Sequence, residues 1–231
     1  GMDIGIAGLR VAISGAGSLP KSGVGELVLT GTNTYGDTII DAGTLTGAIG
    51  NGSLTVNALG TYKVADGVTD FSLSGIQGTG TVNLNAANLT LHAATGTTST
   101  FSFTGTLTGG NQLVKTGGGT LEMLSAAALG GGVAVQEGTL KLADQAFVNA
   151  PVSLGSVAAQ GFIAYTGAGD WTKDIALTGL GGGFTVDNGA SLTVSSAISG
   201  NGAFVKDGAG TLVITGASTY TGGRNVLAGP L

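Results

Sequence analysis

Apolar and polar residues alternate in short runs along most of the chain, which is the period-2 pattern of half-buried β-strands. Residues 52–56 (Gly-Ser-Leu-Thr-Val) and 80–84 (Gly-Thr-Val-Asn-Leu) are typical, and Gly, Asn or Ala closes each run. No segment keeps apolar residues at i, i+3, i+4 and i+7 over the length of a helix. The pattern therefore predicts a chain that is nearly all β.

A longer pattern occurs three times, over residues 13–29, 107–123 and 198–214. It reads apolar-x-Gly-x-x-x-apolar-x-Lys-x-Gly-x-Gly-x-Leu-x-apolar, and similarity downstream extends the copies to about 13–45, 107–140 and 198–231. The structural repeat motif consists of the shared Lys, Gly, Gly and Leu positions: Lys21, Gly23, Gly25 and Leu27; Lys115, Gly117, Gly119 and Leu121; Lys206, Gly208, Gly210 and Leu212. We expect the three copies to occupy equivalent places, with their Leu side chains in one continuous core.

Shorter strand-like units recur about 20 residues apart, which matches one coil of a parallel β-helix. At that spacing, residues 1–231 predict a single solenoid of about eleven coils. The chain has 46 Gly, and Gly forms the sharp corners that such coils need. Asn-Gly pairs such as Asn51-Gly52 also occur in two-residue hairpins, so an antiparallel β-sandwich is the alternative fold.

Charge and cysteine content exclude several classes of function. Charged residues make up 9% of the chain, the net charge is −5, and the eight Lys and Arg are spread singly. Nucleic-acid surfaces need clustered basic residues, so no nucleic-acid partner is expected. The chain contains no Cys, which removes disulfides, thiol catalysis and Cys-based zinc sites.

Two features of the sequence could indicate catalysis: the single His and a Lys-Thr-Gly tripeptide. His92 is the single His and follows a strand, so a surface or turn position is predicted. Residues 115–117 (Lys-Thr-Gly) match a tripeptide of serine β-lactamases, but the companion Ser-x-x-Lys and Ser-Asp-Asn motifs are absent. Because Lys21 and Lys206 occupy the same repeat position, the repeat explains Lys115 better than catalysis does.

Paired carboxylates are candidates for sugar cleavage, because glycosidases use two acids, and aromatic residues are candidates for sugar binding. Three pairs are spaced by four residues: Asp37 and Asp41, Asp66 and Asp70, Asp170 and Asp174. That spacing does not bring two side chains together on a strand, so solvated corners are predicted. Tyr165 and Trp171 could form a platform for a sugar, but a core or coil-capping role is favoured. We expect no catalytic residue, cofactor or metal, and keep a β-helical polysaccharide hydrolase or lyase as the alternative function.

Residues 206–223 resemble the autotransporter-associated β-strand repeat, which reads roughly K-x-G-x-G-x-L-x-L-x-G-x-N-T-Y-x-G-G-T. The first copy follows this motif through Tyr35, and the second departs from it after Met123. The resemblance implies a right-handed parallel β-helix from the passenger of a bacterial type V secretion protein. Such a passenger lies on the surface of a Gram-negative bacterium or is secreted through its outer membrane.

The resemblance also implies a non-enzymatic, adhesin-like stalk. Its expected partners are an unidentified host or cell-surface ligand and a C-terminal β-barrel of the same chain, which this sequence lacks. Because the sequence stops at Gly229-Pro230-Leu231 within the third copy, we expect it to be a fragment, and a monomeric one.

Overall fold

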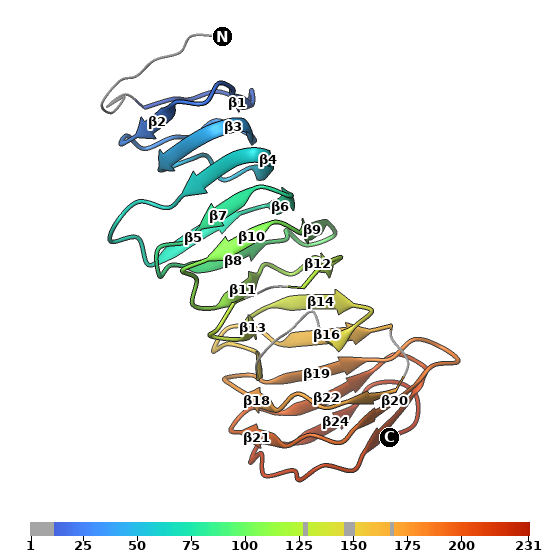
Figure 1. Ribbon diagram of the computed structural model, residues 1–231. Coiled ribbons are helices and arrows are strands. Elements are labelled where there is room, and N and C mark those ends of the chain that lie inside the picture. Colours follow the sequence, from blue (N-terminus) through green and yellow to red (C-terminus); the bar gives the residue numbers. More distant parts are fainter. Residues whose placement is uncertain (1–11, 127–128, 146–150, 167–168) are drawn as a thin grey trace.

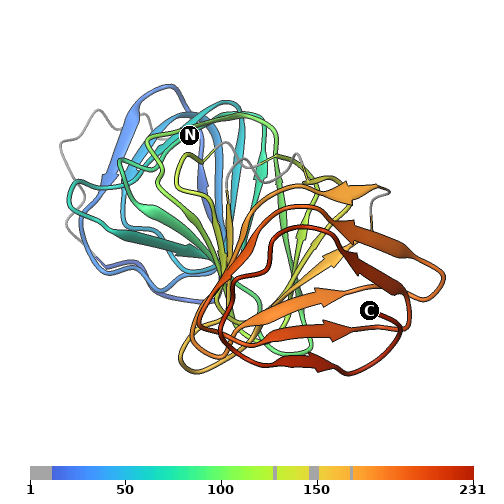
Figure 2. The same ribbon diagram turned by 90° about the horizontal axis from the view of Figure 1, so that it is seen from below.

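The computed structural model describes residues 12–126, 129–145, 151–166 and 169–231. Short strands stack into a rod of about 10 turns, with the N-terminal coils at the top of Figure 1 and the C-terminal coils at the bottom. Figure 2 shows that the C-terminal coils are turned and displaced relative to the N-terminal coils. No helix in the described part of the chain is long and apolar enough to cross a membrane.

Each coil runs over three faces of the solenoid. The largest sheet contains β1 (Leu19–Lys21), β2 (Glu26–Leu29), β3 (Thr38–Gly47), β4 (Ser53–Lys63), β6 (Gly75–Gly78), β7 (Thr81–Asn83), β9 (Thr98–Phe103), β10 (Thr106–Thr108), β12 (Thr120–Met123), β14 (Gly138–Leu142), β16 (Gly161–Tyr165), β19 (Gly182–Thr185), β22 (Phe204–Asp207) and β24 (Arg224–Val226). The second sheet contains β5 (Asp70–Leu73), β8 (Asn88–His92), β11 (Leu113–Thr116), β13 (Val133–Val135), β15 (Val152–Leu154), β18 (Ile175–Leu177) and β21 (Ile198–Gly200). The smallest contains β17 (Asp170–Trp171), β20 (Ser191–Val194) and β23 (Thr211–Ile214).

We name the three faces by their strands. The long face is the continuous path β1-β3-β4-β6-β9-β12-β14-β16-β19-β22-β24, and the seven-strand face is the second sheet. The third face follows the long face in each coil, and carries β2, the ends of β3 and β4, β7, β10, β17, β20 and β23.

Neighbouring strands in the described residues pair in parallel throughout. The predicted parallel β-helix is therefore confirmed, with about 10 turns instead of about eleven. The alternative of an antiparallel β-sandwich is wrong for these residues. Asn-Gly pairs form corners between coils in this chain, which is why they do not mark hairpins.

The core is a set of side-chain columns inside the rod. On the long face Leu121, Leu140, Ile163 and Phe184 are stacked in register in successive coils, and each is fully buried. Burying one such side chain stabilises the fold by about 1.5–3 kcal/mol. The alternation read in the sequence is thus an alternation between this interior and solvent.

The motif copies do not occupy equivalent faces, which corrects the expectation from the sequence. In the first and third copies the Lys strands (β1 and β22) lie on the long face, and the Leu strands (β2 and β23) lie on the third face. In the second copy the Lys strand β11 lies on the seven-strand face and the Leu strand β12 on the long face. The second copy is therefore displaced by one face around the solenoid.

The three Leu residues of the motif also differ in burial. Leu121 and Leu212 are fully buried, whereas Leu27 is only partly buried against the core. Strand β2 pairs with β3 on one side, at the N-terminal end of the described coils. Leu27 therefore packs against the common core, as expected, but it has a neighbouring coil on one side only and stays partly exposed.

Candidate functional site

The three motif lysines point into the solenoid. Lys115 and Lys206 are fully buried and Lys21 is 7% exposed. Lys115 lies in register with Leu91 and Val135, and Lys206 with Phe184 and Val226. A buried lysine needs partners for its ammonium group, because an unpaired charge in an apolar interior is strongly unfavourable.

Backbone carbonyl groups supply those partners in the same way in each copy. The Lys115 Nζ donates to the carbonyl oxygens of Thr116 (3.0 Å) and Gly117 in its own corner, and to Glu137 O (2.9 Å) in the next coil. The Lys206 Nζ donates to Asp207 O (2.9 Å), Gly208 O (2.5 Å) and Ala228 O (2.9 Å).

The first copy repeats this geometry. The Lys21 Nζ donates to Ser22 O (3.3 Å), Gly23 O (2.7 Å) and, in the following coil, Ala42 O (2.9 Å). Each ammonium group thus uses three donors on three carbonyl groups, two in one coil and one in the next. We call this arrangement a lysine clamp.

The glycines of the motif make room for the clamp. Gly23, Gly117 and Gly208, which follow the lysines by two residues, have φ of 82°, 76° and 79°. A Cβ atom on Gly210 would instead lie 2.2 Å from Asp187 O, so this position requires glycine for close packing. One glycine of each pair is thus required by its backbone conformation, and at Gly210 the close contact with the preceding coil adds a second reason.

The next coil contributes a further glycine beside each clamp carbonyl. Gly43, Gly138 and Gly229 have φ of 70°, 71° and 70°. A Cβ atom on Gly138 would lie 2.7 Å from the Lys115 Nζ and 2.5 Å from the carbonyl oxygens of Gly117 and Gly119. The pattern Lys-x-Gly-x-Gly and the Gly about 22 residues later are therefore one structural unit spread over two coils.

Burial is the main cause of the lowered pKa values of two clamp lysines. It lowers the pKa of Lys115 to about 8, and the Glu137 carboxylate opposes this effect. Burial also lowers the pKa of Lys206, with an opposing effect from Asp207. At neutral pH Lys115 keeps its charge, so all three of its N–H groups remain available to the three carbonyl oxygens.

The catalytic candidates are placed apart from one another. His92 is exposed, and its Nδ1 lies 3.2 Å from Thr116 Oγ1 in the next coil. Lys115 of the Lys-Thr-Gly tripeptide is held inside its clamp. In the described residues no group of three or more His, Cys, Asp or Glu is arranged to hold a metal ion.

The paired acids bind separate residues of neighbouring coils. Asp37 accepts hydrogen bonds from the Ser53 N–H (2.7 Å) and hydroxyl (2.9 Å), and Asp41 accepts one from the Asn57 amide (2.7 Å). The Asp174 carboxylate accepts one from the Ala197 N–H (3.1 Å). These carboxylates join coils on the outside of the rod.

Tyr165 and Trp171 form part of the core. Trp171 is fully buried, and its ring packs edge-on against Tyr165 and Phe184 at centroid distances of 5.8 and 5.5 Å. The indole Nε1 donates to Lys173 O (2.7 Å). This pair therefore does not present a flat platform to a sugar.

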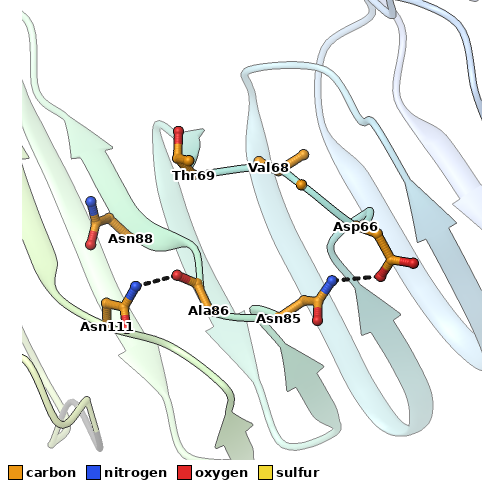
Figure 3. Close-up of a pocket in the computed structure, with 8 residues that line it drawn as sticks. Asp66, Val68, Thr69, Asn85, Ala86, Asn88 and Asn111 are labelled. Atoms are coloured by element: carbon orange, nitrogen blue, oxygen red, sulfur yellow. Dashed lines mark hydrogen bonds between the residues drawn. The ribbon is translucent and has the colours of Figure 1, made fainter.

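A shallow hollow on the N-terminal half of the rod gathers polar side chains (Figure 3). Asp66 accepts a hydrogen bond from the Asn85 amide (2.7 Å), and the Asn111 amide donates to Ala86 O. Asn85 and Ala86 have φ of 48° and 68°, and Ala87 N donates to Leu84 O (2.8 Å), which closes a tight turn. Asn88 and Thr69 complete the polar part of the lining, and the hollow holds a volume of about 510 Å³.

Sequence reasoning found the motif residues but missed the role of the lysines. A charged residue on a strand normally faces solvent, so burial of Lys21, Lys115 and Lys206 was not expected. The signal was available, because a lysine recurs among apolar positions in all three copies while charge is scarce elsewhere. The partner carbonyls of Ala42, Glu137 and Ala228 belong to the next coil and are not marked by any side chain.

The comparisons with known proteins point to one family. A family model described as the passenger-associated-transport-repeat matches residues 19–46, 113–142 and 204–231. The matched segments contain the three lysine clamps. Over 253 aligned positions the chain is 35% identical to the adhesin BmaC autotransporter of Brucella suis biovar 1 (strain 1330). This chain therefore contains three copies of the passenger-associated-transport-repeat and is similar to a segment of an autotransporter.

The match takes in 99% of this chain but 7% of the length of that adhesin. The segment therefore corresponds to a small part of its relative. This similarity supports the location expected from the sequence, on the surface of a Gram-negative bacterium or outside its outer membrane. No solved structure matches the chain.

Proposed function

We propose that this passenger segment is a non-enzymatic, adhesin-like section of a surface rod. Its similarity to an autotransporter named as an adhesin is the observation that carries the proposal. The three clamps use the motif lysines inside the fold, and the paired acids join coils, so these charged groups have structural roles. In the full protein we expect a C-terminal β-barrel to act as translocator, and a host or cell-surface ligand to be the binding partner.

A replacement experiment separates a stalk from an adhesive surface. In the full-length protein, residues 12–231 are exchanged for an equal number of coils from another region of the same passenger. The amount of protein on the bacterial surface is measured with an antibody to a distant region, and adherent bacteria are counted on host cells. If the segment itself binds, adhesion falls while surface display is unchanged.

The opposite outcomes are equally clear. Full adhesion after the exchange would mean that the segment acts only as a spacer. Loss of adhesion when the segment is deleted, but not when it is exchanged, would support the same conclusion. To test the enzymatic alternative, the purified segment is incubated with pectins, uronates and common glycans. We expect no turnover; turnover that disappears in Asp170→Asn or Asp174→Asn would contradict a non-enzymatic function.

A further inference from the structure

Strand β5 leaves one edge of the seven-strand face open in the middle of the N-terminal half. β5 is the first strand of this face and pairs with β8 on its C-terminal side. The cause is a short coil: Thr38 pairs with Leu54, a step of 16 residues, whereas Leu54 pairs with Ile76, a step of 22. The short coil has no strand on this face, and residues 48–52 cross there directly.

The hydrogen-bond pattern shows which backbone groups face the open edge. In a parallel strand, successive residues direct their N–H and C=O groups to alternate neighbours. Asn88 N donates to Thr69 O (2.8 Å) on the β8 side, and Ser74 N donates to Gly52 O (3.1 Å) on the other side. The backbone groups of Asp70 and Ser72 therefore point to the open edge. Among the described residues, this Ser74–Gly52 bond, one residue beyond the end of β5, is the one backbone hydrogen bond between residues 70–74 and residues 48–52.

The corresponding edge of the smallest sheet is covered by a side chain. The Gln145 amide donates to Asp170 O (2.6 Å) and accepts from Thr172 N (2.8 Å), beside strand β17. It thereby takes the place of a neighbouring strand. No side chain of the described residues is hydrogen-bonded to the backbone of Asp70 or Ser72 in this way.

A hollow of about 310 Å³ lies along the open edge, between residues 47–51 and residues 70–72. Its apolar part includes Ile49, Tyr62 and Phe71, and the last two rings stack at a centroid distance of 5.0 Å. It shares Val68 with the hollow of Figure 3, and it shares Asn51 and Ser72 with a third hollow that ends at His92 and Thr116. The three hollows therefore adjoin one another, and we call them together the trough.

The trough has a negative electrostatic character. Asp66 and Asp70 line it, and no Lys or Arg is among its lining residues in the described chain. The other polar lining groups are amides and hydroxyls, apart from His92. A partner that carries basic residues is favoured by this distribution.

We propose that the open edge of β5 binds an extended peptide segment of a partner protein by adding it as a strand. Its backbone pairs with the N–H and C=O groups of Asp70 and Ser72, which is the recognition mode of exposed sheet edges. Side chains at alternate positions enter the apolar hollow beside Phe71, and a Lys or Arg lies beside Asp70. That the partner is a protein on a host or another cell rests on the proposed adhesive function. The test below does not depend on that function, because it uses a model peptide and the purified segment.

The test uses a blocked hexapeptide in which Val alternates with Lys, titrated into the ¹⁵N-labelled segment and followed by NMR. We expect saturable shifts confined to residues 47–51 and 70–74. A second peptide carries N-methyl groups on every other backbone nitrogen and keeps all side chains. It should bind at least about tenfold more weakly, because it cannot pair as a strand.

Two variants of one residue provide the matched control. Ser72→Pro removes the outward N–H without removing a ladder bond, and it should weaken binding about tenfold. Ser72→Ala keeps the N–H and should change the affinity less than about twofold. Melting curves show whether each variant folds; should Ser72→Pro fail to fold, the two peptides on the unchanged segment still test the same claim.

Other results overturn the proposal. Equal binding of the two peptides, shifts at another part of the chain, or no saturable shifts at millimolar peptide would each do so. Shifts in the trough with neutral oligosaccharides and none with the peptide would assign it to sugars and equally overturn strand addition. Bacterial adhesion can persist in all these cases, so failure here is distinguishable from failure of the proposed function.

Discussion

The corner at Lys115 and the edge of β5 differ in how one coil contacts the next: the first is hydrogen-bonded to the neighbouring coil, and the second has no strand paired with it. At Lys115 the buried ammonium group donates to two carbonyls of its own corner and to one of the next coil, and so ties the two coils together. At β5, which lies two strands from the Lys115 strand β11 on the seven-strand face, a short coil leaves backbone groups without a strand beside them. The difference indicates that clamps fix coils locally, while the coils between clamps vary in length and leave surfaces available for binding.

The largest effect is expected at the glycine that closes the clamp. Gly138→Val places a branched side chain at φ +71°, within 2.7 Å of Lys115 Nζ and two carbonyl oxygens. Because two of these neighbours are backbone atoms, we expect a loss of more than about 4 kcal/mol in the free energy of unfolding. Gly130→Val is the control in the same copy, since no atom lies within 4 Å of its Cβ position. Equal urea midpoints for the two variants would contradict the clamp geometry.

A somewhat smaller loss is expected from the core beside a clamp. Leu212→Ala should lower the free energy of unfolding by about 2–5 kcal/mol, because the side chain is fully buried. Leu27→Ala removes the equivalent side chain where burial is partial, and it should lower stability by less than half as much. Urea denaturation of both variants measures this difference, and equal losses would show that the two motif copies are packed alike.

Removal of the clamp ammonium should have a moderate effect. Lys115→Met keeps much of the side-chain volume but removes all three hydrogen bonds that the ammonium group donates to carbonyl oxygens, so we expect a loss of about 3 kcal/mol. Lys141→Met is the control: Lys141 pairs with Glu122 at 2.9 Å, its side chain is 45% exposed, and its replacement should cost much less stability because solvent screens this ion pair. If the Lys115→Met protein is as stable as the unchanged chain, the hydrogen bonds of the ammonium group do not stabilise the fold and the prediction is wrong.

The covered edge should lose stability where the open edge does not. Gln145→Ala removes two hydrogen bonds to the backbone beside β17, and we expect a loss of about 1 kcal/mol. Asn51→Ala changes an exposed amide beside the open edge and should be nearly neutral. Hydrogen exchange at Thr172 should become faster in Gln145→Ala alone; protection that is unaffected would mean that the edge is covered in another way.

The smallest effect is a pH dependence. The pKa of Lys115 is about 8 in the folded chain and near its ordinary value of about 10.5 after unfolding. Between these values the unfolded chain binds more protons, so the free energy of unfolding should rise with pH. Burial raises the pKa of Tyr62, so above about pH 10 the unfolded chain binds fewer protons and stability should fall again. Denaturation from pH 7 to 9.5 should show the rise in the unchanged chain and a smaller one in Lys115→Met.

Much of the fold follows from local chemistry that is visible in the sequence. The period-2 alternation requires strands with one buried side, as in β14 and β16, and the recurrence of about 20 residues requires coils. Glycines at repeated positions such as Gly117 and Gly208 mark corners, because other residues rarely adopt their φ. These features depend on residues close together in the chain, so the sequence alone determined short strands, Gly corners and three copies of one motif. It favoured a parallel β-solenoid over an antiparallel β-sandwich.

The tertiary structure decided what depends on the neighbouring coil. Each of Lys21, Lys115 and Lys206 has one partner in the next coil, a backbone carbonyl 21 or 22 residues away, and a carbonyl leaves no trace in residue type. The face of each copy depends on the accumulated lengths of the coils before it, which vary from a step of 16 to steps above 20. The open edge of β5 has the same origin, because one short coil omits a strand. The position of each strand on the solenoid depends on the lengths of all the coils before it, so it is fixed only when these coils are packed together.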